Sequence, residues 1–249
     1  MRRTGRMTRG SHVRAVVALS VLLAGPARAE EPPCDAADIA VATIPVPPQS
    51  ATAYRRAELV GRAAAQAPGA GIVLLGDSLT ELWPEALARE TFGDGLLNLG
   101  VGSDRTQNVL WRLQDARYAR LAPRTVFLMI GTNNLGYGDK ACAILDGIRR
   151  IVDRIDALWH RPALVVVGTP PRGRKSAFRD DARTALNRAV AELLAGRGGA
   201  VLVEGADAAL RCADDQCPTF LPDMVHLTPE GYATLGAAIR ARRAPAPAP

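Results

Sequence analysis

The sequence has little histidine, few cysteines and few aromatic residues: 3 His, 4 Cys and 11 Phe, Trp and Tyr in 249 residues. The histidines and cysteines form no cluster with the spacing of metal ligands, and no cysteine has a C-x-x-C partner, which argues against a zinc site. The sequence also lacks an internal repeat and any sign of a second large domain. We therefore expect one domain whose chemistry needs no metal or other cofactor.

The overall positive charge suggests a protein that binds an acidic partner, but the excess of basic residues lies near the N-terminus. The formal net charge is +6, a value that a nucleic-acid or anionic-membrane ligand would explain. Residues 1–29, however, contain six arginines and no acidic residue, so the remainder has 31 − 6 = 25 basic residues against 25 acidic ones. The length, the 48% hydrophobic content and the 22% charged content fit a globular domain. We expect no nucleic-acid partner.

The N-terminal residues have the three-part layout of a secretory signal peptide. A basic stretch reaches Arg14, residues 15–24 are apolar but too few to span a bilayer comfortably, and Ala27-Arg28-Ala29 places small residues at the cleavage position. This layout predicts that residues 1–29 are removed and that the protein is secreted or periplasmic, without a stable membrane anchor after cleavage. An uncleaved N-terminal anchor is the alternative.

Strand-like and helix-like segments alternate through the rest of the chain. Such alternation predicts a parallel sheet covered by helices on both faces. The expected class is α/β, a three-layer α/β/α sandwich with a mostly parallel five-stranded sheet. The expected strands lie near residues 71–77, 95–101, 125–131, 163–168 and 200–204, and the expected helices at 81–90, 105–120, 141–159, 179–197 and 229–243.

The domain boundaries follow from composition. Residues 30–49 are rich in Pro and Ala and predict an extended N-terminal segment over the surface, residues 50–243 the main domain, and residues 244–249 a flexible Pro/Ala tail. In an exported chain four cysteines permit disulfides, with three possible pairings. Cys212 and Cys217 bound a short loop that one bridge would close, and Cys34 with Cys142 would then tie the N-terminal segment to the domain.

A Gly76-Asp77-Ser78-Leu79 turn follows directly on an apolar strand-like run, residues 72–75. Open α/β folds bind ligands at the carboxyl ends of their strands, and this turn places a serine hydroxyl there. A serine needs a neighbouring base to become a nucleophile. We expect Ser78 to be that nucleophile.

The three histidines offer one good candidate for the base. His12 lies in the predicted signal peptide, and His160 ends a predicted helix, where a surface role explains it. His226 lies in a loop before the last helix with Asp223 three residues upstream, a spacing that lets the carboxylate orient one ring nitrogen while the other faces a serine. Asp223-x-x-His226 alone also describes an ordinary solvated loop.

Two further strand ends offer hydrogen-bond donors for an oxyanion. One runs from Asn98 through Gly100 and Gly102 to Ser103 and Asp104; the other ends in a Gly131-Thr132-Asn133-Asn134 turn. Backbone N–H groups and an asparagine amide at such ends can stabilise the charge that develops when an ester carbonyl is attacked. Turn formation alone is the competing explanation for each.

Together these four segments resemble the SGNH, or GDSL, serine esterases and lipases. The stretch from Asn98 to Leu113 with Gly131-Thr-Asn-Asn134 is most similar to the catalytic-subunit branch of platelet-activating-factor acetylhydrolases. The resemblance implies a flavodoxin-like SGNH hydrolase fold over residues 50–243, subunits that associate in pairs, and hence a homodimer as one possible state.

The resemblance also assigns roles to residues. It implies a Ser78–His226–Asp223 triad, and an oxyanion hole made by the N–H of Ser78, the side chain of Asn133 and a backbone N–H of the second segment. Ser103 stands where the family usually has glycine, and a serine keeps the N–H. Asn134 stands where the family often has aspartate.

The expected reaction is hydrolysis of a small-molecule ester or lipid, such as a short-chain acyl ester, an acetyl ester or a lysophospholipid, through an acyl-enzyme. Activity should rise with pH as the histidine base loses its proton, near the unperturbed imidazole pKa of about 6.5. Two other functions compete: a non-catalytic binding protein on the same scaffold, and a nucleotide-binding protein suggested by Gly100-Val101-Gly102. The second lacks the third glycine of G-x-G-x-x-G and a Walker lysine.

Two further segments have less definite roles. Trp111 and Arg112 match the resembled family, but an apolar helix face explains the tryptophan, and we expect both in the core. Residues 170–175, Pro-Pro-Arg-Gly-Arg-Lys, follow the fourth expected strand. They are expected to form a solvated loop, with a border of the substrate cleft as the alternative.

Overall fold

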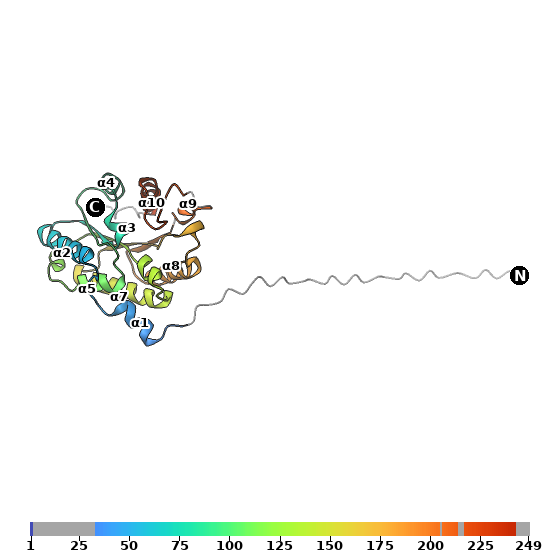
Figure 1. Cartoon of the computed structure of the whole chain (residues 1–249), viewed down its shortest axis with the longest axis horizontal. Helices are drawn as coiled ribbons and strands as arrows, with labels where there is room; N and C mark the ends of the chain where they lie inside the picture. The colour runs from blue at the N-terminus through green and yellow to red at the C-terminus, as the bar shows by residue number, and fades with distance from the viewer. Residues whose placement is uncertain (2–32, 205, 214–216, 243–249) are drawn as a thin grey trace. The chain divides into compact units, whose positions relative to one another are not determined.

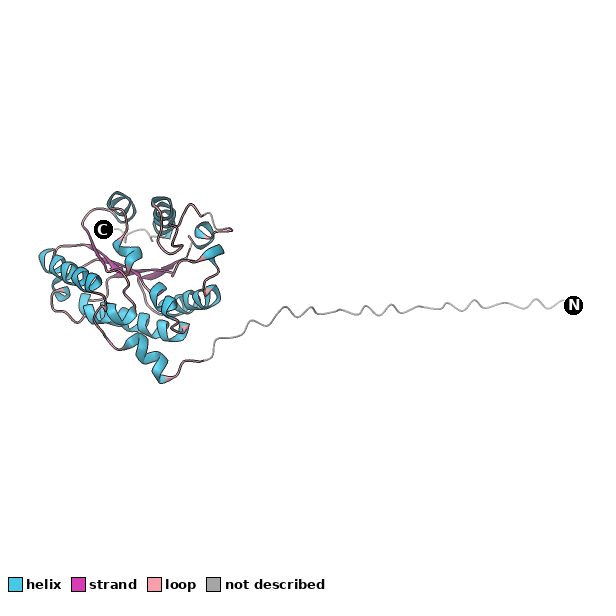
Figure 2. Cartoon of the chain, viewed as in Figure 1, coloured by secondary structure: helices cyan, strands magenta, loops and turns pink. Residues whose placement is uncertain are grey.

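A five-stranded sheet forms the centre of the protein (Figures 1 and 2). The computed structural model describes residues 1, 33–204, 206–213 and 217–242. The predicted signal peptide, apart from Met1, and the predicted C-terminal tail lie outside the described residues and remain predictions. The strands are β1 (Ile72–Gly76), β2 (Leu96–Gly100), β3 (Thr125–Met129), β4 (Ala163–Val167) and β5 (Ala200–Val203).

The strand order is β2-β1-β3-β4-β5, and every neighbouring pair is parallel. Each expected strand is present, one or two residues shorter than the sequence suggested. Helices cover both faces of the sheet (Figure 2). The predicted three-layer α/β/α sandwich is therefore confirmed, and the sheet is parallel throughout.

Alternate residues of the strands build two separate cores. Val126 and Leu128 of β3 pack on one face against α2 (Ala51–Gln66), α5 (Thr106–Arg112), α7 (Ala141–Trp159) and α8 (Asp180–Ala195). Phe127 and Met129 pack on the other face against α3 (Ser78–Glu81), α4 (Glu85–Phe92), α9 (Asp207–Leu210) and α10 (Pro229–Arg242). Burial on both faces explains why the strands read as continuous apolar runs rather than as an alternating pattern.

The N-terminal segment differs from the prediction. Residues 30–49 were expected to be extended, but α1 (Ala36–Thr43) lies within them. Asp35 caps this helix: its carboxylate accepts the N–H of Asp38 at 2.9 Å, and the Asp38 carboxylate accepts the N–H of Asp35 at 3.0 Å. The helix packs against α7 (Figure 1). A reciprocal cap and this packing stabilise a helix that the proline content had argued against.

Other differences concern further helices. Neither α2, which Ser50 caps, nor the short α6 (Thr132–Tyr137) was expected. The helix expected over 105–120 ends as α5 at Arg112 and is followed by a short 3-10 turn, η1 (Tyr118–Arg120). A second 3-10 turn, η2 (Arg174–Ser176), lies within the loop after β4. His160 ends α7 in the left-handed region and is exposed, in the surface position expected for it.

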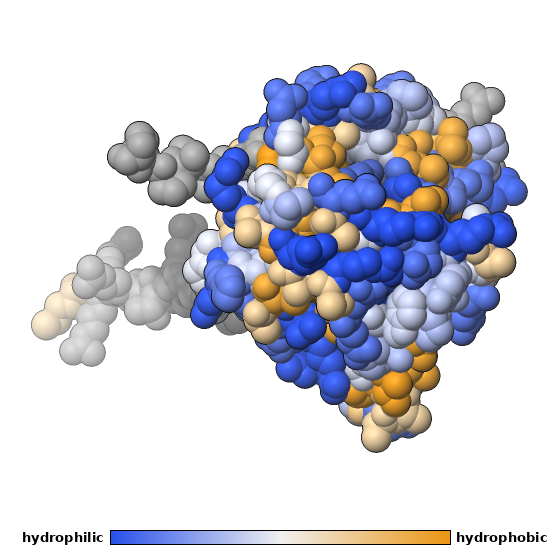
Figure 3. All heavy atoms as spheres, turned by 90° about the vertical axis from the view of Figure 1, so that its left-hand side faces the viewer, coloured by the Kyte–Doolittle hydropathy of each residue, from blue (hydrophilic) through white to orange (hydrophobic). Residues whose placement is uncertain are grey.

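Both expected disulfides are present. One joins Cys34 to Cys142, and so links the chain before α1 to the start of α7; the other joins Cys212 to Cys217. No helix in the described ranges is both long and apolar enough to cross a bilayer. Figure 3 shows one face of the molecule, on which hydrophilic residues predominate and hydrophobic residues form separate small groups.

Arg112 is buried, but it is not an apolar core residue. Its Nε lies 2.8 Å from Oδ2 of Asp104, and Nη2 lies at the same distance from that oxygen. The same guanidinium donates to the Leu99 carbonyl at 3.0 Å, to the Tyr118 hydroxyl at 3.1 Å and to the Gly76 carbonyl at 3.3 Å. This buried ion pair joins β1, β2 and α5 behind the strand ends. Trp111 beside it is half-buried against the core.

Candidate active site

The serine lies at the junction of β1 and α3. Asp77 caps α3: its Oδ1 accepts the N–H of Leu79 at 3.0 Å, so Ser78 becomes the first residue of the helix. Gly76 is required just before the turn, because a Cβ there would lie 2.2 Å from the Met129 carbonyl oxygen. The hydroxyl is partly exposed at the carboxyl edge of the sheet, as the sequence predicts.

The loop before α10 brings a histidine and an aspartate to this serine. The Nε2 atom of His226 lies 2.9 Å from Oγ of Ser78, although 148 residues separate them. On the other side of the ring, Nδ1 lies 2.6 Å from Oδ2 of Asp223. The remaining carboxylate oxygen accepts the N–H groups of Val225 and His226, each at 2.9 Å. A tight turn thus fixes the carboxylate, the ring and the hydroxyl in one hydrogen-bonded chain.

The pKa values of two carboxyl groups near the serine are shifted in opposite directions. Partial burial acts to raise the pKa of Asp223, but hydrogen bonds from the His226 ring and from two backbone N–H groups outweigh it, so the pKa lies below the ordinary value. Asp77 is fully buried, and loss of solvation raises its pKa to about 7 although Leu79 donates to it. Of the two carboxyl groups, Asp223 is therefore the one that is ionised at neutral pH.

The two expected donor segments meet beside Ser78. Asn133 lies in the first turn of α6, and its Nδ2 donates to the Asp104 carbonyl at 3.0 Å, so the amide is next to the turn that contains Ser103. Ser103 is exposed and has a φ of 65°, in the left-handed region that glycine adopts readily. The Gly102 N–H is already engaged: it donates to Oε2 of Glu81 at 2.6 Å.

Asn134 has a different position from Asn133. It is buried, its Oδ1 accepts the N–H of Thr106 at 3.0 Å, and its Nδ2 donates to Oδ2 of Asp139 at 2.8 Å. The Asn134 amide therefore links α6 to the start of α5 and does not reach the partly exposed edge. The structure separates the two asparagines into an edge residue and a buried connecting residue.

The loop after β4 borders the site. The Gly173 N–H donates to the Met224 carbonyl at 2.8 Å, next to the histidine loop. Arg172 is half-buried, donates to the Thr132 carbonyl at 2.8 Å and stacks on the Phe178 ring at 4.8 Å. The alternative interpretation of residues 170–175, a border of the cleft, fits this loop in part: Arg174 lines a cavity beside Met224 although it is largely exposed, and Lys175 is exposed.

Two cavities adjoin the turn that contains Ser103 and the loop that contains Met224. One, of about 270 Å³, lies beside Ser103 and is also lined by Arg105, whose guanidinium lies 4.4 Å from the Tyr137 ring centroid. The other, of about 470 Å³, lies beside Met224 and Phe220. Within the described part of the chain, no group of three or more His, Cys, Asp or Glu side chains is placed to hold a metal ion.

Glu81 and Arg56 were missing from the sequence-based site. Glu81 lies on α3, three residues after Ser78, and Oε1 of its carboxylate is 3.3 Å from Nε of Arg56. That nitrogen also donates to the Gly100 carbonyl at 3.1 Å. The position of Glu81 in a helix that begins with the serine was the available signal, while Arg56 gave none, because 25 residues separate it from Glu81.

Comparison with known proteins identifies the family. The sequence matches the profile of the GDSL-like Lipase/Acylhydrolase family over residues 74–234, a range that contains all of these site residues except Arg56. The chain belongs to this family. It is a carboxylic ester hydrolase of the GDSL, or SGNH, type, and the resemblance seen in its sequence motifs is confirmed.

Individual relatives fit this assignment. The human platelet-activating factor acetylhydrolase IB subunit alpha1 is 31% identical over 163 residues, which cover 65% of this chain and 70% of that protein. The structure is also similar to a GDSL-like lipase from Bacteroides thetaiotaomicron (TM-score 0.58, 18% identity, 76% of this chain and 95% of that one). A carbohydrate esterase family 3 protein from Talaromyces cellulolyticus is similar with a TM-score of 0.56 at 17% identity, and the match covers 69% of this chain and 94% of that one. These two structures support the fold alone.

Proposed function

We propose that this GDSL hydrolase is an exported serine esterase in which Ser78, His226 and Asp223 form the catalytic triad. The observation that carries the proposal is the hydrogen-bonded chain from Asp223 through His226 to Ser78, with distances of 2.6 and 2.9 Å. These contacts satisfy both requirements of an activated serine: a base within reach of the hydroxyl and a third group that orients the base.

The proposed reaction has two steps. Ser78 Oγ attacks the ester carbonyl while His226 Nε2 accepts its proton, and Asp223 stabilises the imidazolium. His226 then returns the proton to the departing alcohol, which leaves an acyl-enzyme. Water repeats the sequence and releases the acid. The lowered pKa of Asp223 supports this assignment, because a carboxylate that stays ionised at neutral pH is the required partner.

The oxyanion hole is proposed to consist of three donors. Ser78 is the first residue of α3, so its N–H has no partner within the helix. Ser103 supplies a backbone N–H from the adjacent turn, and its φ of 65° lies in the left-handed region that glycine, the usual residue of the family there, adopts readily. Asn133 uses one N–H of its amide on the Asp104 carbonyl, which leaves the second for the oxyanion.

We propose a short-chain acyl or acetyl ester, or a lysophospholipid, as the substrate. The name of the human relative, an acetylhydrolase of platelet-activating factor, favours a small acyl group. Export is proposed from the layout of residues 1–29 and is supported by the two disulfides, which persist in oxidising compartments. N-terminal sequencing of secreted protein should find Glu30 first.

A p-nitrophenyl ester series from acetate to palmitate tests the proposed function. The wild-type chain from Glu30 should hydrolyse the shorter esters, and Ser78→Ala and His226→Ala should each lose the activity at least a thousandfold. Asp153→Asn, which changes an acidic residue in an exposed ion pair with Arg149 on α7, is a matched control that should keep it. Equal rates in wild type and Ser78→Ala would refute the triad and leave a binding role as the alternative.

A further inference from the structure

We infer that Glu81 is a positioning residue of the oxyanion hole, which holds the turn around Gly102 so that the N–H of Ser103 faces the oxyanion. The inference rests on the proposed function, because it assigns the Ser103 N–H to the reacting oxygen. It concerns a side chain outside the triad and outside the three proposed donors. The carboxylate acts through the turn and does not touch the substrate.

The first contact is between Glu81 and the turn itself. The Gly102 N–H donates to Oε2 of Glu81 at 2.6 Å, and the acceptor is a carboxylate, which makes this a strong charge-assisted hydrogen bond. A Cβ built on Gly102 would lie 3.2 Å from that oxygen and 3.9 Å from the Cβ of Ser78. The turn therefore lies directly against α3, over both the serine and the glutamate.

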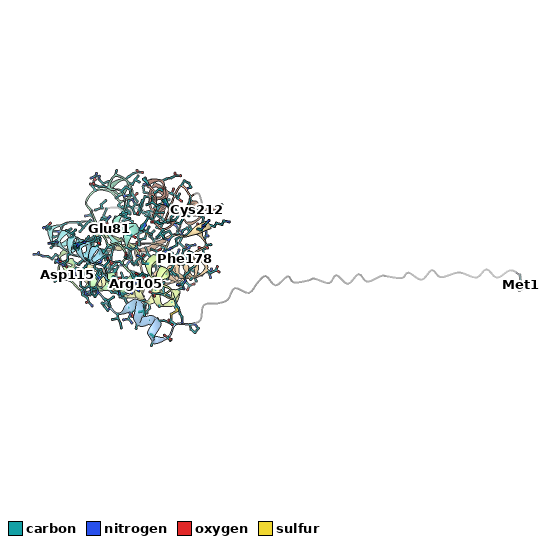
Figure 4. The ribbon with its side chains drawn as sticks, in the orientation of Figure 1. Met1, Glu81, Arg105, Asp115, Phe178 and Cys212 are labelled. Atoms are coloured by element: carbon teal, nitrogen blue, oxygen red, sulfur yellow. A yellow bond between two sulfur atoms is a disulfide. The ribbon has the colours of Figure 1, made fainter. Side chains whose placement is uncertain are left out.

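The second contact fixes the glutamate. Arg56 of α2 places its Nε 3.3 Å from Oε1 of Glu81 and 3.1 Å from the carbonyl oxygen of Gly100, which ends β2. The two carboxylate oxygens thus have separate partners, a backbone N–H and a guanidinium. Both ionic side chains are only about one-third exposed or less, at 31% and 27%. Figure 4 labels Glu81 among the side chains of this part of the domain.

The third contact is steric. A Cβ on Gly100 would lie 2.2 Å from the backbone nitrogen of Glu81 and 2.7 Å from its Cα. The backbone of β2 therefore meets that of α3 without room for a side chain, just before the turn begins. Close packing at Gly100 and the hydrogen bond of Gly102 to the Glu81 carboxylate thus hold both ends of this short stretch of backbone against α3.

The turn needs such a restraint because Ser103 has a φ of 65°, a conformation that residues with a Cβ adopt at a cost. Glu81 accepts the N–H of the Val101–Gly102 peptide and so anchors the glycine that directly precedes Ser103. Without that anchor, the backbone dihedrals of Gly102 can readjust to relieve the cost at Ser103, and the Ser103 N–H would then turn away. Because Glu81 already occupies the Gly102 N–H, that group is not an oxyanion donor. The same carboxylate thus selects which of two neighbouring N–H groups serves the reaction.

Three variants test the inference on p-nitrophenyl acetate. Glu81→Ala removes the acceptor, Glu81→Gln keeps a neutral oxygen acceptor for the Gly102 N–H, and Glu85→Ala removes a nearby exposed acidic residue whose partner is Arg89. Loss of a whole oxyanion donor lowers kcat about 10²–10³-fold. We therefore expect kcat to fall about 10- to 100-fold in Glu81→Ala, with KM within twofold of wild type. In Glu81→Gln and Glu85→Ala, kcat should stay within about threefold of wild type.

A trifluoromethyl ketone separates positioning from a merely structural role, because its serine adduct carries an oxyanion. Its inhibition constant should rise in Glu81→Ala by the same factor as kcat falls, while the thermal midpoint leaves the variant folded at the assay temperature. An unchanged kcat in folded Glu81→Ala, or a loss of activity with no change in inhibitor affinity, would overturn the inference.

The amide proton of Gly102 gives a readout that does not depend on turnover. A short bond to a carboxylate should place its NMR signal far downfield in wild type and in Ser78→Ala, and the signal should move upfield in Glu81→Ala. An unshifted signal in Glu81→Ala would overturn the inference even if the enzyme is active. If the NMR signal shifts as expected but wild type shows no Ser78-dependent turnover, the proposed function and the catalytic part of the inference are refuted. The contact between Gly102 and Glu81 would then still stand.

Discussion

Replacement of Arg112 by methionine should destabilise the protein strongly and in a pH-dependent way. The change removes both contacts of the guanidinium with the buried Asp104 carboxylate. It also removes the hydrogen bonds to the Leu99 carbonyl, the Tyr118 hydroxyl and the Gly76 carbonyl. Breaking one side of a buried ion pair costs about 3–5 kcal/mol. We expect that loss in the free energy of unfolding at pH 8.

The dependence on pH follows from Asp104. Burial raises its pKa to about 6 even with Arg112 beside it, and without the guanidinium the pKa rises further. An acid whose pKa is raised in the folded state loses stability as pH rises from its unfolded value through its folded one. The cost of Arg112→Met should therefore be smaller at pH 5, where the folded variant binds the proton, than at pH 8.

Urea unfolding at both pH values measures this cost. Arg89→Met, which breaks an exposed ion pair with Glu85, is the matched control and should cost no more than about 1 kcal/mol at either pH. Adding Asp104→Asn to Arg112→Met should recover part of the loss at pH 8, because the buried charge is gone. A cost below about 1 kcal/mol, or an equal cost at pH 5 and pH 8, would show that the pair is not an energetically important buried interaction.

Three other predictions concern the site and the fold. Asn133→Ala should lower kcat about 10²–10³-fold with little change in KM, since it removes a proposed oxyanion donor, and such a donor binds the oxyanion more strongly than the substrate carbonyl. A change of KM alone in steady-state kinetics would contradict this. Ser103→Gly should keep the activity and raise the free energy of unfolding by about 0.5–1 kcal/mol. Relief of the backbone strain at a left-handed φ, about 1–2 kcal/mol, exceeds the entropic cost of glycine, about 0.4–1 kcal/mol. A variant that is less stable than wild type in urea would refute this strain. The double variant Cys34→Ser/Cys142→Ser should have a free energy of unfolding about 2–5 kcal/mol lower than wild type, because the disulfide closes a loop with a sequence separation of 108. An unchanged thermal midpoint would contradict this stabilisation.

The fold could be predicted because its signals are local. Buried parallel strands read as apolar runs such as residues 72–75, and the helices between them have polar faces, so the order of elements fixed the class. The helix α1 was missed because its stability comes from the Asp35 cap and from packing on α7, whereas the prolines around it suggested an extended chain. Short helices such as α6 have too few residues for a periodic pattern.

The candidate site was predictable as far as it is marked by motifs. Ser78, Asp223, His226 and Asn133 stand in short turns whose residue types suit the chemistry, and the structure brings all four to one edge of the sheet. The contacts that hold the turns depend on long-range geometry. No sequence pattern links Arg56 to the Gly100 carbonyl, or Glu81 to the Gly102 N–H.

Buried charge is hard to foresee for the same reason. Arg112 stands in an apolar helix face and reads as a core position, but its guanidinium ends on the carboxylate of Asp104 and on three other oxygen atoms. Only the packed structure shows that these partners converge. The separate positions of Asn133 and Asn134, one at the site edge and one buried, are another difference that neighbouring letters in a sequence do not reveal.

Reaction with a fluorophosphonate tests the central claim, an activated Ser78, most directly. Intact-mass measurement of the chain from Glu30 should show one adduct per molecule, and peptide mapping should place it on Ser78. The His226→Ala variant should react far more slowly, because it lacks the base 2.9 Å from the hydroxyl. No adduct on the folded wild-type protein, or an adduct on a different serine, would contradict the account.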